Sequence, residues 1–322
     1  MKGDGATSIM VYGTPQVQAL NQKLAEDKIP GTSPGFGIAA SADGKRYPYL
    51  FPIAATYWSQ GAGGDQFVKD KLGGSLEGKK IAYLFYDNPA GREPIPIIED
   101  LQKIERIRAA NLCRAAARGR DGRAGARHHP ALPARLRDCP SVRPGAVGSD
   151  QGVQSATAIR CPKRWVWCGP QPRPISRRPA AGRSPKAITR CQFAGAGDDY
   201  PVRQEIKAMY KAQGKEPPKE MDDTVVYNRG ILWAAVHVEA IRNALKANGG
   251  KQPTGEEVKK GFEQIHDFSL GGLVPPLKVT AADHEGGGWV QVFQVKGGKL
   301  VKETEWFRGY PEVVAQTVAK AE

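Results

Sequence analysis

The chain has 322 residues, a net charge of +14 and a hydrophobic content of 40%. This length is enough for about two domains, each with its own core. No run approaches the roughly 18 apolar residues of a membrane-spanning helix, and the first residues lack the charged-then-apolar order of a signal peptide. We therefore expect either a cytosolic protein or one whose start is missing.

The N-terminal third alternates short apolar runs with helical patterns. Ser8–Tyr12 is predicted to form a buried strand, and Val17–Asp27 a helix. Thr14 is a good N-cap for this helix, and Pro15 suits its first position. Prolines bracket the candidate strand Tyr47–Pro52, which predicts an edge strand. The remaining predicted elements are strands at Lys28–Pro34, Tyr47–Pro52 and Lys80–Tyr86, and helices at Thr56–Lys71 and Glu93–Ile104.

The C-terminal part carries clearer local signals. Thr254 and Glu257 form a capping-box pattern at the start of a helix. Gly297-Gly298 separates two alternating runs and predicts a hairpin. Helices are predicted at Tyr200–Gln213, Val225–Ala247 and Thr254–Glu263, and strands at Phe268–Pro275, Leu277–Thr280, Trp289–Lys296 and Lys299–Glu305. Strands that alternate with helices predict the α/β class, with mostly parallel sheets flanked by helices.

The middle stretch, Glu105–Cys191, differs from the rest of the chain in composition. It holds 17 Arg and 2 Lys against 1 Glu and 3 Asp, a net charge of +15, so the other residues sum to −1. It also holds all five cysteines and 10 of the 25 prolines, but no Phe, Tyr or Met. Two hypotheses compete: an arginine-rich, nucleic-acid-binding insert, or a reading-frame error in a GC-rich gene.

Back-translation favours the frame error. Asn111–Gly125 can be encoded so that a shift of one nucleotide reads TFAVPPPGVEMGAQ. Ala131–Ser149, shifted likewise, can read RYRPDFVIAHLFGRAPSV, which resembles a helix end followed by a buried strand. Gln154–Cys168, shifted by two nucleotides, can read KRNGYPLSKAVGLVW, a turn followed by another strand. With the stretch set aside, the chain is nearly neutral, and its overall charge no longer indicates a polyanion partner.

Patterns typical of catalysis, cofactors or metals are absent from the sequence. The glycine runs at 271–272 and 286–288 do not follow a strand into a helix with Lys-Ser/Thr, so we interpret them as turns. The histidines lack metal-ligand spacing and are interpreted as ordinary core or surface residues. The pairs Asp198-Asp199 and Asp222-Asp223 could act as acid and base, but solvated turns and helix caps explain them better. We expect no enzyme activity, no cofactor and no metal.

The turn Tyr12-Gly13-Thr14-Pro15 is the best candidate for a binding site. It lies at the carboxyl end of a predicted buried strand and opens a helix, which is where open α/β sheets bind ligands. A helix N-terminus offers free N–H groups and partial positive charge, which suit a carboxylate. The alternative is an ordinary helix start.

Four N-terminal segments, SIMVYGTPQVQAL, KIPGTSPG, KRYPYLFPIAATYWSQG and GKKIAYLFYDNPAGRE, resemble the substrate-binding proteins of branched-chain amino acid ABC transporters. KEMDDTVVYNRGILWAAVHVEAIRNAL and EGGGWVQVFQVKGGKLVKETEWF resemble the C-terminal half of that family. The resemblance covers residues 1–104 and 192–322, and the shifted reading frames supply the missing middle in the family's order.

The resemblance implies a periplasmic-binding-protein-like fold of type I, in which two α/β lobes close on a ligand. The first lobe would be residues 1–104, without its opening βα units and signal peptide. Residues 105–191 would replace most of the second lobe's core, and 192–322 would complete that lobe with the hinge strands and a β-ribbon. The family's first lobe holds an amino acid's carboxylate. The residues implied here are Tyr12, Gly13, Thr14, Gly35 and Phe36. Weaker candidates for the cleft wall are Tyr57 and the loop Tyr86–Asn88, which includes Asp87.

The function implied by the resemblance is that of a monomeric periplasmic receptor that delivers a branched-chain amino acid, or a similar small carboxylate, to an inner-membrane permease. An aromatic acid remains open, because the second-lobe loops fall in the middle stretch. For this chain as it stands, the frame error predicts weak or lost binding. Two alternatives remain: an arginine-rich nucleic-acid-binding protein, and a two-lobe amide or aromatic-acid sensor without a transport role.

Overall fold

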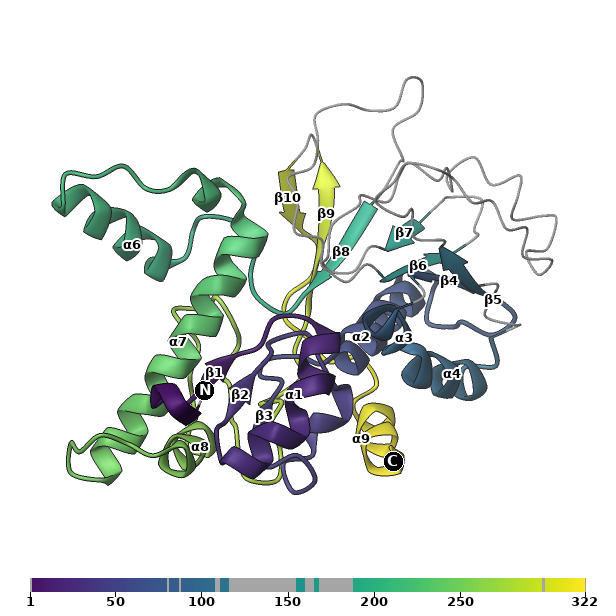
Figure 1. Cartoon of the computed structure of the whole chain (residues 1–322). Coiled ribbons are helices and arrows are strands. Elements are labelled where there is room, and N and C mark those ends of the chain that lie inside the picture. Colours follow the sequence, from purple (N-terminus) through teal and green to yellow (C-terminus); the bar gives the residue numbers. More distant parts are fainter. Residues whose placement is uncertain are drawn as a thin grey trace, which may run out of the picture.

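The computed structural model describes residues 2–79, 81–86, 88–107, 111–115, 155–159, 165–167, 188–296 and 299–321. These residues form two sheets with helices packed against them (Figure 1). The three-stranded sheet has the order β1 (Ile9–Met10), β2 (Gly31–Thr32), β3 (Leu50–Phe51). The seven-stranded sheet has the order β10 (Lys299–Lys302), β9 (Gln291–Lys296), β8 (Ile188–Gln192), β7 (Trp165–Trp167), β6 (Ser155–Ile159), β4 (Ile81–Tyr86), β5 (Asn111–Ala115).

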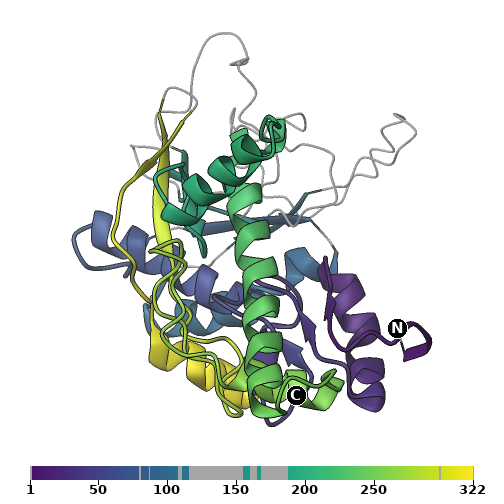
Figure 2. The same cartoon turned by 90° about the vertical axis from the view of Figure 1, so that its left-hand side faces the viewer.

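The three-stranded sheet is parallel, and its strands β2 and β3 are buried. Strand β1, expected to be buried, is a partly exposed edge, because Met10 is 56% exposed. Successive side chains of a strand point to opposite faces. Leu50 packs with α1 (Thr14–Asp27) on one face. Its neighbour Phe51 stacks on Phe262 of α8 (Gly255–Glu263) on the other, with ring centroids 4.8 Å apart. The long helix α7 (Thr224–Ala247) packs against α8 on this second face, as Figure 2 shows.

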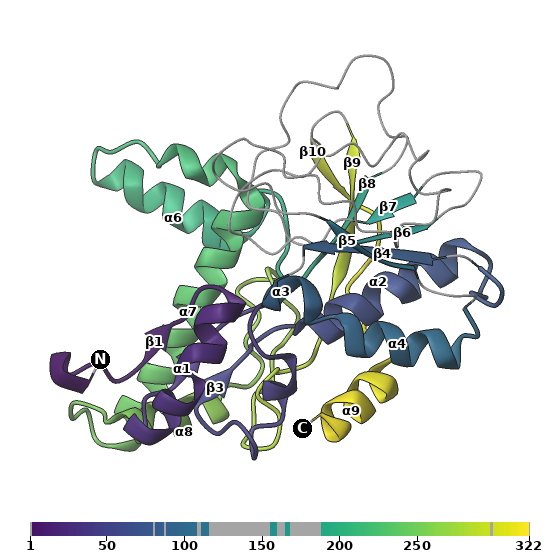
Figure 3. The same ribbon diagram turned by 45° about the vertical axis from the view of Figure 1, so that its right-hand side comes forward.

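The seven-stranded sheet mixes parallel and antiparallel pairs around β4, which pairs parallel with β5 and antiparallel with β6. Tyr83 and Phe85 of β4 pack in one cluster with Ile97 and Leu101. The helices α2 (Tyr57–Lys71), α4 (Ile95–Ile104) and α9 (Pro311–Lys320) lie together on this side of the sheet (Figure 3). The other helices are α3 (Pro89–Arg92), α6 (Pro201–Ala212) and the 3-10 turns η1 (Lys2–Asp4), η2 (Ala39–Ala42) and η3 (Lys219–Asp222). Within the described ranges, none of the helices is both long and apolar enough to span a bilayer.

Most predicted elements are confirmed, but the start of α1 and the region from 268 to 280 differ from the expectation. Thr254 and Glu257 form the expected capping box, and β9 pairs with β10 as a hairpin. However, Thr14 does not cap α1, because Gly13 takes the N-cap position and Thr14 is the first helical residue. The region from 268 to 280 contains one isolated bridge, Phe268–Leu277, in place of two strands. Positive φ angles from Leu270 to Gly272 interrupt extended pairing there.

The two sheets do not follow the expected division at residues 104 and 191. Strand β4 belongs to the seven-stranded sheet, although residues 1–104 were expected to form the first lobe. Helices α7 and α8 pack on the three-stranded sheet, although they lie within 192–322. Within the middle stretch, the structure describes residues 105–107, the strands β5, β6 and β7, and residues 188–191 of β8. The rest of the stretch lies outside the described residues.

Short segments join the two sheet units. Ala54 follows β3; its N–H donates to the Glu285 carbonyl at 2.8 Å, and its carbonyl accepts from Gly288 N at 3.1 Å. Glu93, between α3 and α4, accepts a hydrogen bond from the Ala39 N–H of η2 at 2.6 Å. Burial raises the pKa of the Glu93 carboxyl to about 7. A carboxyl group that titrates near neutral pH therefore lies at the junction of the two units.

Replacing Glu93 with Gln should make stability less sensitive to pH. Because the folded-state pKa of Glu93 is raised, its protonated form adds stability below pH 4.5, and this is lost as pH rises through about 7. Gln can still accept from Ala39 and cannot ionise. The unfolding free energy of E93Q minus that of the parent chain should rise by up to about 3 kcal/mol from pH 5 to pH 8, measured by urea unfolding. E99Q, on the exposed face of α4, is the control. Parallel pH curves for E93Q and the parent would contradict this account.

Candidate functional site

The start of α1 is open to a ligand's negative charge. Gly13 is the N-cap, with φ 102° and ψ 139°, and it provides no side chain to cap the helix. A residue with a Cβ rarely adopts this φ, so glycine suits the position. The first N–H groups of a helix have no intrahelical acceptor and carry partial positive charge. This end of α1 therefore offers backbone donors.

Thr14 connects the helix start to the loop at residues 33–37. Its side chain is fully buried, and its Oγ1 accepts a hydrogen bond from Gly37 N at 3.3 Å. Because the oxygen is the acceptor in this bond, the hydroxyl proton can still be donated. The Thr14 side chain is thus held in place, and its hydroxyl can still donate a hydrogen bond to another group.

The loop at 33–37 depends on a glycine. Gly35 has φ 72°, and a Cβ at this position would lie 2.1 Å from Cε1 of Phe193. Phe193 follows β8, so the Phe193 ring brings the second sheet's chain against the first sheet's loop. Any larger residue at 35 would push this ring away.

Four rings linked through Phe36 form the aromatic cluster: Tyr12, Phe36, Tyr57 and Phe193. Phe36 lies at its centre, with ring centroids 5.3 Å from Tyr12, 6.4 Å from Tyr57 and 6.3 Å from Phe193. Phe36 and Tyr57 are buried, whereas Tyr12 is 50% exposed. The cluster therefore presents an aromatic edge to solvent at Tyr12.

The Tyr57 hydroxyl is buried near Thr14, and among the described residues no well-aligned hydrogen bond satisfies it. Burial raises the pKa of Tyr57 well above its usual value, with a smaller opposing effect from Thr14. The phenol therefore stays protonated and can donate. Unpaired buried polar groups are costly, and their presence indicates a site that a further group can satisfy.

Arg229 and Gln192 also lie near the aromatic cluster, although the sequence did not identify them as site residues. Arg229 of α7 is 8% exposed, and its Cζ lies 4.7 Å from the Phe193 ring centroid. Its Nη2 donates to Gln192 Oε1 at 2.6 Å. The only sequence signal was an arginine in a helix that is apolar on most sides, and nothing local connected it to residues 12–14.

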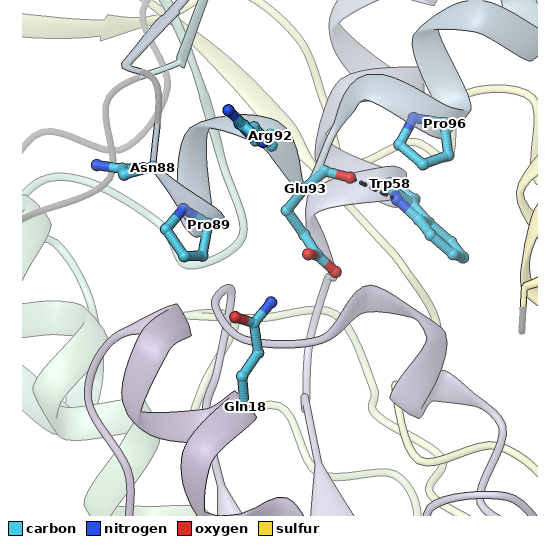
Figure 4. A pocket seen from close by; sticks show the side chains of 7 residues that line it. All are labelled: Gln18, Trp58, Asn88, Pro89, Arg92, Glu93 and Pro96. Carbon is cyan, nitrogen blue, oxygen red and sulfur yellow. Dashed lines mark hydrogen bonds between the residues drawn. The ribbon is translucent and has the colours of Figure 1, made fainter.

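A cavity of about 390 Å³ lies beside this region, between α1, α2 and α3 (Figure 4). Gln18 of α1 and Glu93 point toward one another across it, and Trp58 Nε1 donates to the Glu93 carbonyl at 2.8 Å. The cavity is lined by Gln18, Trp58, Asn88, Pro89, Arg92, Glu93 and Pro96. Asn88, from the Tyr86–Asn88 loop expected at the cleft wall, lines it, and Trp58 is the sequence neighbour of Tyr57.

The structure brings six of the predicted residues together: Tyr12, Gly13, Thr14, Gly35, Phe36 and Tyr57. Tyr86 ends β4, and Asp87 lies outside the described residues.

Two of the four acid–base candidates, Asp198 and Asp223, have structural roles. Asp198 bonds to Arg203 and Lys207, and Asp223 caps α7. The Lys207 ammonium is the leading cause that lowers the pKa of Asp198. His237 is buried against the Thr32 hydroxyl, and burial lowers its pKa to about 4. In the part of the chain that the structure describes, no three His, Cys, Asp or Glu side chains gather as metal ligands.

No protein-family model matches the sequence, and no curated protein matches it. Solved structures do. A protein described as an ABC transporter permease from the Pseudomonas fluorescens group is 25% identical, with a TM-score of 0.74 over 97% of this chain and 77% of that one. A branched-chain amino acid ABC transporter protein from Thermus thermophilus, with bound valine, is 17% identical (TM-score 0.69, 96% and 80% covered). An R. palustris solute-binding protein in complex with 4-hydroxybenzoate is 16% identical (TM-score 0.60, 95% and 79% covered).

At 17% and 16% identity the last two likenesses show the fold alone. They agree with the first in covering nearly the whole chain and in sharing an α/β architecture of two lobes. The family resemblance stated from the sequence is thereby confirmed: the structural neighbours of this chain are type I periplasmic solute-binding proteins of ABC transporters, and the chain has their two-lobe fold.

Proposed function

We propose that this protein is an extracytoplasmic, periplasmic receptor that binds a small carboxylate between its two lobes and delivers it to an ABC permease. It performs no chemistry on the ligand. The observation that carries the proposal is the uncapped start of α1, where the buried Thr14 lies beside the aromatic cluster. Helix N–H groups and a hydroxyl suit a carboxylate, and the rings suit an apolar body.

The position of the site supports a receptor. The cavity beside it is lined by Gln18 of α1, from the three-stranded sheet's side, and by Asn88 and Glu93, from the seven-stranded sheet's side. A ligand held between two units makes contacts to both, and such contacts stabilise a closed arrangement that a partner can recognise.

A branched-chain amino acid is the ligand that the family resemblance favours. An aromatic carboxylate is the second candidate, and the Phe36-centred aromatic cluster favours it, because flat rings pack well against ring edges. The ligands bound in two of the similar structures, valine and 4-hydroxybenzoate, include both chemistries.

Thermal unfolding of the full chain with millimolar ligand tests the proposal. We expect leucine, valine or 4-hydroxybenzoate to raise the unfolding temperature and glucose to leave it unchanged. Binding should be weak, because the loops expected to supply the second wall fall within 105–191. For a dissociation constant of about 1 mM, 10 mM ligand adds about 1.4 kcal/mol. No rise with any carboxylate would contradict the receptor function, and micromolar binding would contradict the frame error.

Replacing Thr14 with Val should weaken carboxylate binding about tenfold, because a hydrogen bond to a charged group contributes about 1.5–3 kcal/mol. It should also cost about 1 kcal/mol of stability through the lost Gly37 bond. T317V is the matched control: Thr317 is buried in α9 and bonds to Asp100. T317V should lose similar stability and keep ligand affinity. Equal affinity in T14V and T317V, measured by calorimetric titration, would show that Thr14 is only structural.

A further inference from the structure

Arg229 is a buried cation. Among the described residues it has fewer hydrogen-bond and ion-pair partners than Arg203, a structural arginine of the same chain. Arg203 is 2% exposed, and its guanidinium donates to Asp198, Asn228 and the Met221 carbonyl. Arg229 is 8% exposed, yet no carboxylate among the described residues lies within ion-pair distance of it. A buried charge without a counter-ion is costly, and chains retain such groups mainly at functional sites.

Two donors at this place have no acceptor. Nε of Arg229 and Nε2 of Gln192 are buried and make no hydrogen bond with the described residues. The two side chains are neighbours, joined by the bond from Arg229 Nη2 to Gln192 Oε1 at 2.6 Å. Two adjacent unused donors, one of them cationic, match the two oxygens of one carboxylate.

The aromatic cluster adjoins this pair of donors. Phe193, one of its four rings, lies under the guanidinium with 4.7 Å between Cζ and the ring centroid. Burial lowers the pKa of Arg229 to about 10, and Tyr12 and Tyr57 of the cluster are close enough to oppose the shift. The guanidinium therefore stays charged at neutral pH. The Tyr57 hydroxyl, also unsatisfied, is close enough to influence Arg229 electrostatically.

We propose that Arg229 is a specificity-determining residue that pairs with the carboxylate of the transported ligand and selects acids over their neutral amides. Gln192 assists it as a second donor, and the ligand's apolar body packs against the aromatic cluster. The inference rests on the proposed function, and it adds a charged residue from α7 to a site otherwise built from the N-terminal region.

Two matched ligand pairs test the proposal with the full chain: benzoate against benzamide, and leucine against leucinamide. Dissociation constants are measured by ligand-observed NMR at millimolar concentration. In at least one pair, the parent chain should bind the acid at least tenfold more tightly than the amide, and R229Q should clearly lower this ratio. R242Q is the control, because Arg242 is an exposed residue of the same helix that pairs with Glu239. R242Q should keep the parent's ratio.

Stability of the free protein separates a binding role from a structural one. R229M removes an uncompensated buried charge, so its unfolding temperature without ligand should equal or exceed that of the parent chain. A clearly lower unfolding temperature for R229M would overturn the proposal, since Arg229 would then be structural. An unchanged acid-to-amide ratio in R229Q would overturn it and leave the receptor function intact. Absence of binding to either acid by the parent chain would contradict both.

Discussion

The packing of Phe193 against Gly35 is the contact on which the candidate site depends. The ring occupies the space that a Cβ at residue 35 would need, 2.1 Å from its nearest atom. It thereby fixes the 33–37 loop against the chain that leaves β8. Phe36, within that loop, then reaches Tyr12 and Tyr57, and Arg229 lies over the Phe193 ring. One glycine thus allows segments from both sheet units to meet at one point.

A second constraint is the alternation of side chains in the three-stranded sheet. Leu50 faces α1, and Phe51 faces α8, so both sides of a very short sheet are covered. This packing holds α1 with its N-terminus at the edge where the strands end. The backbone donors and the Thr14 hydroxyl are therefore presented by a fixed helix, which is the arrangement that charged ligands require.

Helix starts and strands could be predicted from the sequence where one local pattern determined the structure. Thr254 with Glu257 predicted a helix start correctly, because both partners of the capping box lie within one turn. Thr14 was assigned one position too early in its helix, because Gly13 can adopt the positive φ of an unusual N-cap. The predicted strand Phe268–Pro275 does not form, because Leu270 adopts a positive φ. A leucine side chain gives no sign of that conformation in the sequence. The site was only partly predictable for a related reason. Residues 12–14 have the pattern of a helix start, but Arg229, more than 200 positions later, adjoins the aromatic cluster only through tertiary packing on Phe193.

The central claim is that a carboxylate binds at the uncapped start of α1. Amide chemical-shift mapping of the isotope-labelled full chain with millimolar 4-hydroxybenzoate or leucine tests it most directly. The largest saturable shifts are expected at the amides of Gly13, Thr14 and Gln16, since Pro15 has no N–H, and at Gly37, whose N–H bonds to Thr14. Saturable shifts that leave these amides unmoved and cluster elsewhere would contradict it.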